Sequence, residues 1–213
     1  MPKRTAIILG ALIIALLAWT GLILQFYTAT IAYLAKGRTT GGTIIEILSF
    51  FTIQTNLLVA ISLTTVAITK QSFFTKPSVL TAIGVYITIV SIVYNLVLRQ
   101  LAHFTGITRL GDELVHLIVP VLYVAFWLAF ISKGTLQWRN AFPWLWYPFF
   151  YLIYILVRGA FTNLYPYPFI NVSNLGYHAV FVNIAVLMIV FLAVSMLYIF
   201  IARMISKRAN KVG

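Results

Sequence analysis

The sequence predicts an all-α polytopic membrane protein, built as a bundle of six transmembrane helices with short loops. Of its 213 residues, 62% are hydrophobic and only 8% are charged, which is about a third of the charge typical of a soluble domain. The apolar residues also fall into six stretches, and a helix needs about 20 residues to cross the hydrocarbon of a bilayer. In lipid, only a helix satisfies its own backbone hydrogen bonds over such stretches.

We expect one transmembrane domain over residues 1–213, with spans at residues 5–26, 44–69, 79–98, 113–131, 142–158 and 179–202. The first apolar run exceeds the 7–15-residue core of a secretory signal, so we expect a retained helix. Six spans place both termini on one side, together with ten of the fifteen Lys and Arg residues. The positive-inside rule therefore predicts cytoplasmic termini in a multi-pass protein of the cell membrane.

Composition also excludes several classes of function. The net charge of +12 first suggests nucleic-acid binding, but the basic residues are spread over loops and tail rather than gathered on one face. We therefore expect membrane lipids as partners, and no nucleic acid. The chain has no Cys, which excludes disulfides and thiolate metal sites. Its three His and three acidic residues show no metal-ligand spacing, and no nucleotide-binding loop occurs, so we expect no metal and no cofactor.

Polar residues gather near the end of each span that this topology places outside. In the second span they lie at Glu46, Ser49, Thr52 and Asn56, and spacings of 3, 3 and 4 put them on one face of a helix. Other spans contribute the remaining polar residues of these outer ends, which include Asn95, Arg99, Asp112, His116, Arg158, His178 and Asn183. The sequence thus predicts a water-accessible polar cavity that opens outward.

Such a cavity suits a hydroxyl nucleophile with a histidine base, because the hydroxyl must lose its proton as it attacks. Thr52 and His116 are the candidates, and Asp112 lies four residues before His116, within reach of its ring. Amide donors from Gln54, Asn56 or Asn95 would stabilise the oxyanion. Arg99 or Arg158 would bind a substrate carboxylate, with His178 and Asn183 in support. Each residue also has a structural interpretation. A Thr in a membrane helix, for example, usually bonds back to its own helix.

Three short motifs resemble the androgen-induced protein family, which includes the androgen-dependent TFPI-regulating protein and many prokaryotic relatives. They are Phe50-Phe51-Thr52, the segment 112–116 followed by Pro120, and the loop 165–170. The run 52–58 is similar to the prokaryotic branch. This resemblance implies an intramembrane threonine hydrolase that cleaves fatty acid esters of hydroxy fatty acids, with Thr52 as nucleophile and His116 as base. Pro120 follows His116 by four residues, whereas the animal pattern has one residue more.

Two functions from different classes remain open. The first is a lipid-ester hydrolase, a threonine-dependent carboxylic ester hydrolase whose fatty-acyl ester substrate enters from the bilayer. The second is a small transporter or lipid-binding protein, in which Glu46, Asp112 and His116 relay protons or hold a headgroup. The largely apolar inner half counts against transport, because it offers no second gate.

Overall fold

The computed structural model describes residues 2–69, 71–101 and 103–212. Within these residues every regular element is helical, and six helices are long and apolar enough to cross a membrane. The chain is therefore an all-α, multi-pass membrane protein, as predicted. The six helical segments are Arg4–Ala35, Phe51–Ile68, Pro77–Leu101, Gly106–Phe130, Trp138–Thr162 and Val172–Lys207.

The second predicted span, residues 44–69, is not one helix. It is divided into α2 (Thr40–Leu48) and α3 (Phe51–Ile68), with Phe50 in an extended conformation between them. The Ser49 hydroxyl donates to the Ile45 carbonyl at 2.6 Å, and the Gln54 side chain donates to the Leu48 carbonyl at 2.8 Å. These side chains take over carbonyls that a continuous helix would bond itself. The predicted face that joined Glu46 to Asn56 is therefore interrupted.

The other segments agree with the predicted spans in position, and each extends beyond its span at one end or at both. The first runs to Ala35 rather than residue 26, and the last begins at Val172 rather than residue 179. Hydropathy marks the hydrocarbon-spanning part of a helix, whereas the helix itself continues into the interfacial region.

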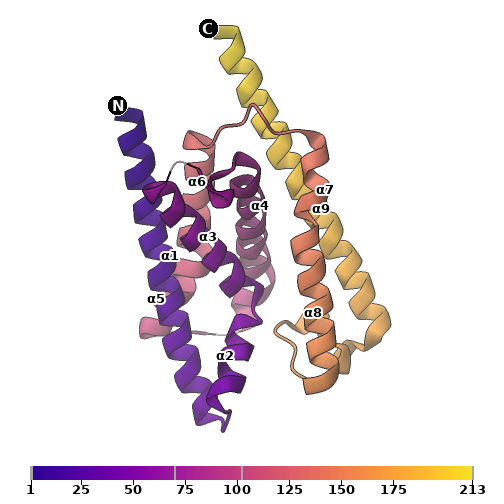
Figure 1. Cartoon of the computed structure of the whole chain (residues 1–213). Helices are drawn as coiled ribbons and strands as arrows, with labels where there is room; N and C mark the ends of the chain where they lie inside the picture. The colour runs from indigo at the N-terminus through magenta and orange to yellow at the C-terminus, as the bar shows by residue number, and fades with distance from the viewer. Residues whose placement is uncertain (1, 70, 102, 213) are drawn as a thin grey trace. The chain divides into compact units, whose positions relative to one another are not determined.

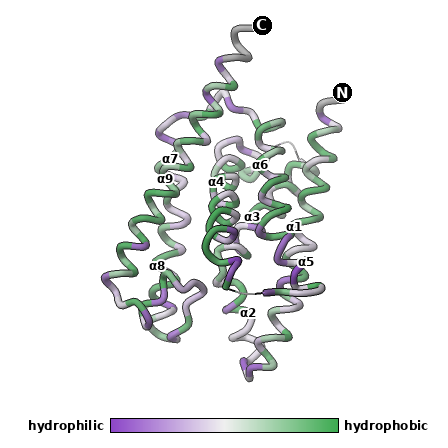
Figure 2. Tube along the Cα trace, turned by 180° about the vertical axis from the view of Figure 1, so that it is seen from behind, coloured by the Kyte–Doolittle hydropathy of each residue, from purple (hydrophilic) through white to green (hydrophobic). Residues whose placement is uncertain are grey.

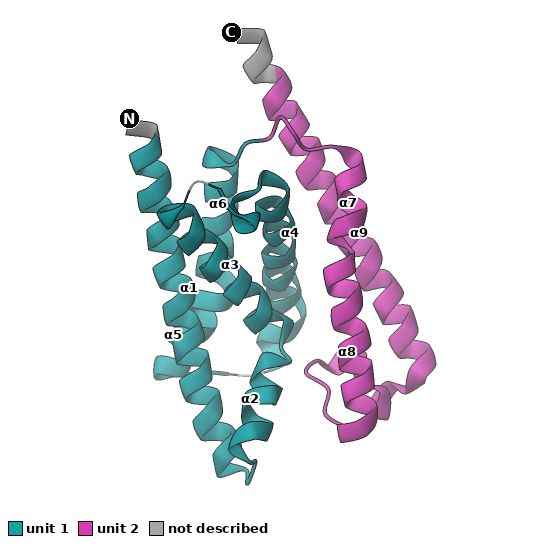
Figure 3. Ribbon diagram, viewed as in Figure 1, with its two compact units in different colours: residues 1–132 teal, residues 133–213 magenta. Residues whose placement is uncertain are grey.

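The chain divides into two compact units, residues 1–132 and residues 133–213 (Figure 3). The sequence predicts one domain over residues 1–213, and this stays a prediction. Residues 1, 70, 102 and 213 lie outside the described residues. Hydrophobic residues cover most of each long helix, and hydrophilic residues lie mainly near helix ends and in loops (Figure 2).

In the first unit, α1 (Pro2–Ala35) packs along α3 and against α5 (Gly106–Glu113) and α6 (Val119–Phe130), while α4 (Pro77–Val93) packs against α3 and α6 (Figure 1). A short turn, η1 (Phe73–Thr75), precedes α4. Polar side chains link these helices. Trp19 of α1 donates to the Thr64 hydroxyl of α3, and Trp127 of α6 donates to the Thr81 hydroxyl of α4. Hydrogen bonds of this kind hold helices together where water cannot compete.

The contact of α1 with the fourth membrane segment depends on two glycines. A Cβ atom at Gly21 of α1 would lie 2.8 Å from Val115 Cγ1, and one at Gly111 of α5 would lie 3.0 Å from Leu24 Cβ. Small residues at a crossing let two helix backbones approach closely. Gly21 therefore sets how closely α1 approaches the segment that carries His116.

In the second unit, η5 (Trp138–Asn140) and α7 (Ala141–Trp144) lead into α8 (Trp146–Thr162). A loop containing η6 (Pro168–Ile170) then connects α8 to α9 (Val172–Val212), which bends at Gly176. Both α7 and α8 pack against α9, so this unit is a helical hairpin.

Candidate functional site

The backbone around His116 departs from regular α-helix just before Pro120. Residues Leu114–Ile118 form a π-helical turn, η4, in which the Val119 N–H bonds to the Leu114 carbonyl five residues back. Proline has no N–H, so Pro120 bonds neither to the His116 carbonyl, four residues back, nor to the Val115 carbonyl, five residues back. Two buried carbonyls therefore need partners from elsewhere. Single π-helical turns occur frequently at functional sites.

Side chains from two other helices supply these partners. The Asn56 amide nitrogen of α3 donates to the Val115 carbonyl at 3.0 Å. Ser91 of α4 and Asn95 of the second π-helical turn, η2 (Tyr94–Leu98), donate to the His116 carbonyl at 2.8 and 3.1 Å. Both carbonyls thus have hydrogen-bond partners, as burial in the bundle requires.

His116 and Asp112 form an oriented pair. The His116 Nδ1 atom lies 3.0 Å from both the backbone oxygen and the carboxylate Oδ1 of Asp112. Both partners are acceptors when the carboxylate is ionised, so Nδ1 must carry the proton. In the neutral ring, Nε2 is then the nitrogen with a free lone pair. Asp112 is only 6% exposed, so this pair is largely shielded from water.

Tyr94 completes this pair, although the sequence did not single it out. Its hydroxyl donates to Asp112 Oδ2 at 2.5 Å, and its ring stacks on the His116 ring, with centroids 3.5 Å apart and planes 9° apart. The Asp112 carboxylate therefore bridges a phenol and an imidazole. The three side chains fix one another, because each is held by two contacts.

Arg99 lies at the edge of this cluster, paired with Glu113. Its Nη1 and Nη2 atoms contact the two carboxylate oxygens of Glu113 at 2.8 and 2.7 Å, and its guanidinium carbon lies 5.6 Å from the Tyr94 ring centroid. Both terminal nitrogens are thus occupied. The predicted role of Arg99 in binding a substrate carboxylate stays a prediction. It requires the ion pair between Arg99 and Glu113 to break.

The Thr52 hydroxyl differs from the threonine hydroxyls that bond back to their own helix, and it shares the lack of a partner among the described residues with Thr43 and Thr55. The hydroxyls of Thr28, Thr64, Thr65 and Thr81 each donate to the carbonyl four residues back. Thr52 lies in the first turn of α3, just after the helix break, and the carbonyl four residues back, that of Leu48, accepts from Gln54 instead. Within the described residues, the Thr52 hydroxyl makes no hydrogen bond. It is 8% exposed, so the usual structural role of such a hydroxyl is missing here.

One amide nitrogen connects the segments that carry Thr52 and His116. Asn56 Nδ2 donates both to the Thr52 carbonyl at 2.9 Å and to the Val115 carbonyl at 3.0 Å. The first turn of α3 and the π-helical turn η4 are therefore direct neighbours. Among the described residues, no hydrogen bond joins the Thr52 hydroxyl to the His116 ring. Catalytic hydrogen bonds are often long or poorly aligned until substrate binds.

The amides predicted to stabilise an oxyanion are engaged elsewhere. Gln54 bonds to the Leu48 carbonyl, Asn56 to two carbonyls, and Asn95 to the carbonyls of Ser91 and His116. Their oxyanion role stays a prediction, and it would require these amides to change partners. The residue before the first turn of α3, Phe50, provides no side-chain cap within the described residues.

The other predicted residues belong to the second unit. There Arg158 Nη1 donates to the Leu164 carbonyl at 3.1 Å, and Asn183 Nδ2 donates to the Phe169 carbonyl at 2.8 Å. Both side chains hold the loop between α8 and α9. His178 is exposed near the start of α9. Their predicted supporting roles stay predictions, whereas the cluster around His116 is formed by the first unit alone.

Comparisons with protein-family models, with characterised proteins and with solved structures find no match to this chain. The resemblance to the androgen-induced protein family therefore stays a prediction, and the site must be interpreted from its own geometry.

Sequence reasoning missed two members of the cluster, Ser91 and Tyr94, although the sequence carried a signal for both. Ser91, Asn95 and Arg99 recur every four residues at the end of the third span, and Tyr94 lies beside this polar face. Tyrosine is common in membrane segments as an interfacial residue, so its type alone does not indicate a role in a buried cluster.

Proposed function

We propose that the protein is an intramembrane lipid-ester hydrolase that uses Thr52 as nucleophile and His116 as general base. The observation that supports this most directly is that two groups without hydrogen-bond partners among the described residues, the Thr52 hydroxyl and His116 Nε2, lie on neighbouring segments. The Thr52 hydroxyl makes no hydrogen bond within the described residues, and the bonding of His116 Nδ1 to Asp112 leaves Nε2 as the proton acceptor. Asn56 ties the two segments together.

In the proposed reaction, the Thr52 oxygen attacks the ester carbonyl carbon and the hydroxyl proton passes to His116 Nε2. The tetrahedral intermediate collapses, the alcohol leaves with the proton from Nε2, and an acyl-threonine ester remains. Water then attacks this ester, again giving its proton to Nε2. The fatty acid departs as Thr52 regains its proton from Nε2. Asp112 holds the ring in the required tautomer and stabilises its charged form.

The oxyanion of each tetrahedral intermediate needs donors, and the first turn of α3 offers them. The N–H groups at a helix N-terminus point outward and carry partial positive charge. Thr52 and Ile53 both lie in this turn. In this proposal their backbone N–H groups, rather than the amides of Asn56 or Asn95, bind the oxyanion. An arrangement in which the residue after the nucleophile donates its N–H is known from other hydrolases.

The substrate class follows from the surroundings of the site. Thr52 and His116 lie on helices that cross the membrane, so an ester with long acyl chains reaches them from the bilayer. Fatty-acyl esters, including fatty acid esters of hydroxy fatty acids, fit this requirement. We place the protein in the cell membrane, with the site in the outer half of the bundle, on the basis of its predicted topology.

The test is covalent labelling together with turnover of a fluorogenic fatty-acyl ester by the purified full chain in detergent. Thr52→Val removes the nucleophilic oxygen but keeps the shape of the side chain, so both labelling by a fluorophosphonate probe and turnover should be lost. Thr52→Ser should retain both. Thr55→Val is the matched control, because Thr55 is fully buried in the same helix and its hydroxyl also lacks a partner within the described residues.

Full turnover in a folded Thr52→Val variant would exclude Thr52 as nucleophile. Loss of turnover in Thr55→Val, but not in Thr52→Val, would move the role to Thr55. If the natural chain itself does not hydrolyse esters, while proteoliposomes that contain it take up a solute in response to a pH gradient, the transporter alternative is correct and the hydrolase is wrong.

A further inference from the structure

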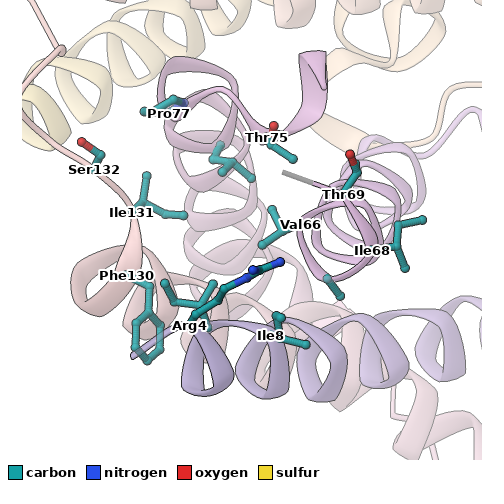
Figure 4. Close-up of a pocket in the computed structure, with 13 residues that line it drawn as sticks. Arg4, Ile8, Val66, Ile68, Thr69, Thr75, Pro77, Phe130, Ile131 and Ser132 are labelled. Carbon is teal, nitrogen blue, oxygen red and sulfur yellow. The ribbon is translucent and has the colours of Figure 1, made fainter. Parts of the chain in front are cut away.

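A second feature lies at the other end of the first unit, near the N-terminus of α1. It is a pocket of about 300 Å³ between the start of α1, the end of α3, the start of α4 and the end of α6 (Figure 4). We call it the N-terminal pocket. Arg4 lies about 25 Å along α1 from Gly21, at a rise of 1.5 Å per residue, and Gly21 is the residue that faces Val115. The pocket is therefore separate from the cluster around His116.

The walls of the N-terminal pocket are mainly apolar, and its lining includes one charged side chain. Ile8, Val66, Leu80 and Phe130 are among the apolar residues, whereas Arg4 is the single charged residue among the described residues of the lining. Figure 4 shows the Arg4 side chain directed into the pocket, with its nitrogens towards Val66. Within the described residues Arg4 has no ion pair and no hydrogen bond.

The helix ends around this pocket do not neutralise Arg4. The N-termini of α1 and α4 and the C-termini of α3 and α6 meet here. Their partial charges, roughly +0.5 at each N-terminus and −0.5 at each C-terminus, nearly cancel. The full positive charge of Arg4 therefore remains, in a pocket whose other walls supply hydroxyls but no acid. Thr69 and Ser132 provide such hydroxyls, and within the described residues neither makes a side-chain hydrogen bond.

We propose that the N-terminal pocket binds the phosphate group of an anionic phospholipid. Arg4 is the charged contact, the hydroxyls of Thr69 and Ser132 are neutral donors, and Ile8, Leu80 and Phe130 contact the first part of the acyl chains. The predicted topology places this end of the protein at the cytoplasmic leaflet. That leaflet contains anionic lipids, and basic pockets between membrane helices on that side bind lipid headgroups. Trp19 joins α1 to α3, Tyr123 and Trp127 join α6 to α4, and the two pairs pack against each other.

Native mass spectrometry of the full chain in detergent tests this site, with titrations of phosphatidylglycerol and phosphatidylcholine. The natural chain should bind phosphatidylglycerol about fivefold more tightly than Arg4→Gln, since one arginine near an anionic lipid contributes about that factor. Lys207→Gln is the matched control. Lys207 is an exposed basic residue predicted to lie on the same side of the membrane, and it is not part of the pocket lining. The affinity of the Lys207→Gln variant for phosphatidylglycerol should differ from that of the natural chain by less than about twofold.

A second variant, Ile8→Trp, fills the pocket without changing its charge and should weaken phosphatidylglycerol binding by at least as much as Arg4→Gln. Equal affinity in the natural chain and in both pocket variants would overturn the site. Inorganic phosphate and oleate provide two further arms. Thermal stabilisation by inorganic phosphate alone that equals the effect of the lipid would identify a site for free phosphate. A preference for oleate would identify a carboxylate site instead. Either result would contradict the proposal that the pocket binds a phospholipid.

Discussion

The ring of Tyr94 lies flat against the ring of His116, with centroids 3.5 Å apart, and the Tyr94 hydroxyl bonds to the same carboxylate that orients His116. Tyr94 thus restrains the imidazole in two ways. Its ring contacts the face of the imidazole directly, and its hydroxyl bonds to the Asp112 carboxylate that contacts His116 Nδ1. Both rings come from π-helical turns, η2 and η4. The geometry of the candidate base depends on these two local departures from regular helix.

Tyr94→Phe tests this relationship, because it keeps the stacked ring and removes only the hydrogen bond to Asp112. We expect kcat for ester hydrolysis to fall about 10- to 100-fold, which corresponds to the loss of a hydrogen bond to a charged group. KM should stay nearly constant, since Tyr94 acts through the base. Steady-state kinetics measures both, and a raised KM at unchanged kcat would show that Tyr94 contacts the substrate instead. Tyr94→Leu, which also removes the stacking, should be less active still.

Asp112→Asn should reduce kcat by a factor of about 10² to 10⁴, as the loss of the orienting carboxylate does in related triads. The asparagine side chain can present its N–H to His116 Nδ1 and so favour the wrong tautomer. The rate of fluorophosphonate labelling of Thr52 should fall in parallel. Glu46→Gln is the control, because Glu46 pairs with Arg38 on another segment, at 3.6 Å. If both variants lose activity equally, the loss reflects charge rather than orientation of the ring.

Pro120→Ala should lower activity at least tenfold without lowering thermal stability. Alanine supplies the N–H that proline lacks, so the His116 carbonyl can bond within its own helix and η4 can relax towards regular α-helix. That change rotates His116 away from Tyr94 and Asp112. Thermal unfolding in detergent and ester turnover measure the two effects. Unchanged turnover would mean that the π-helical turn does not depend on Pro120.

Gly21→Ala should destabilise the protein by about 1–3 kcal/mol, because its new Cβ atom would lie 2.8 Å from Val115 Cγ1. Gly41→Ala is the matched control, since a Cβ atom there meets nothing within 4 Å. Adding Val115→Ala to Gly21→Ala should restore part of the lost stability, which a double-mutant cycle of thermal unfolding in detergent measures. Independent effects of the two changes would contradict the close contact.

The fold class was predictable from hydropathy, because a long apolar helix can be recognised from its own residues without knowing which helices it packs against. The division at Ser49 and Phe50 was not, since neither residue is a proline or a glycine that would mark a helix break in the sequence. The break depends on which side chains accept or donate at particular carbonyls, and hydropathy does not record this. It also changed the interpretation of Thr52, whose hydroxyl would have a carbonyl partner in a continuous helix.

Pro120 shows what the sequence does contain about the site. A proline within a span predicts an unbonded carbonyl four residues earlier, here that of His116. The sequence does not say that Asn56, Ser91 and Asn95 supply the missing donors, because these residues come from helices whose rotation is set only by packing. Asn56 and Asn95 were noticed as polar residues within the spans and predicted as oxyanion donors, but the structure gives their amides carbonyl partners.

The double hydrogen bond of Asn56 has a mechanical consequence. A membrane protein is tilted and strained whenever the thickness of its bilayer changes, and two reacting groups on separate helices would normally drift apart under such strain. Here a single side chain pins the backbone beside the alcohol to the backbone beside the imidazole. We therefore expect the spacing of the two groups to change less with bilayer thickness than it would without this link.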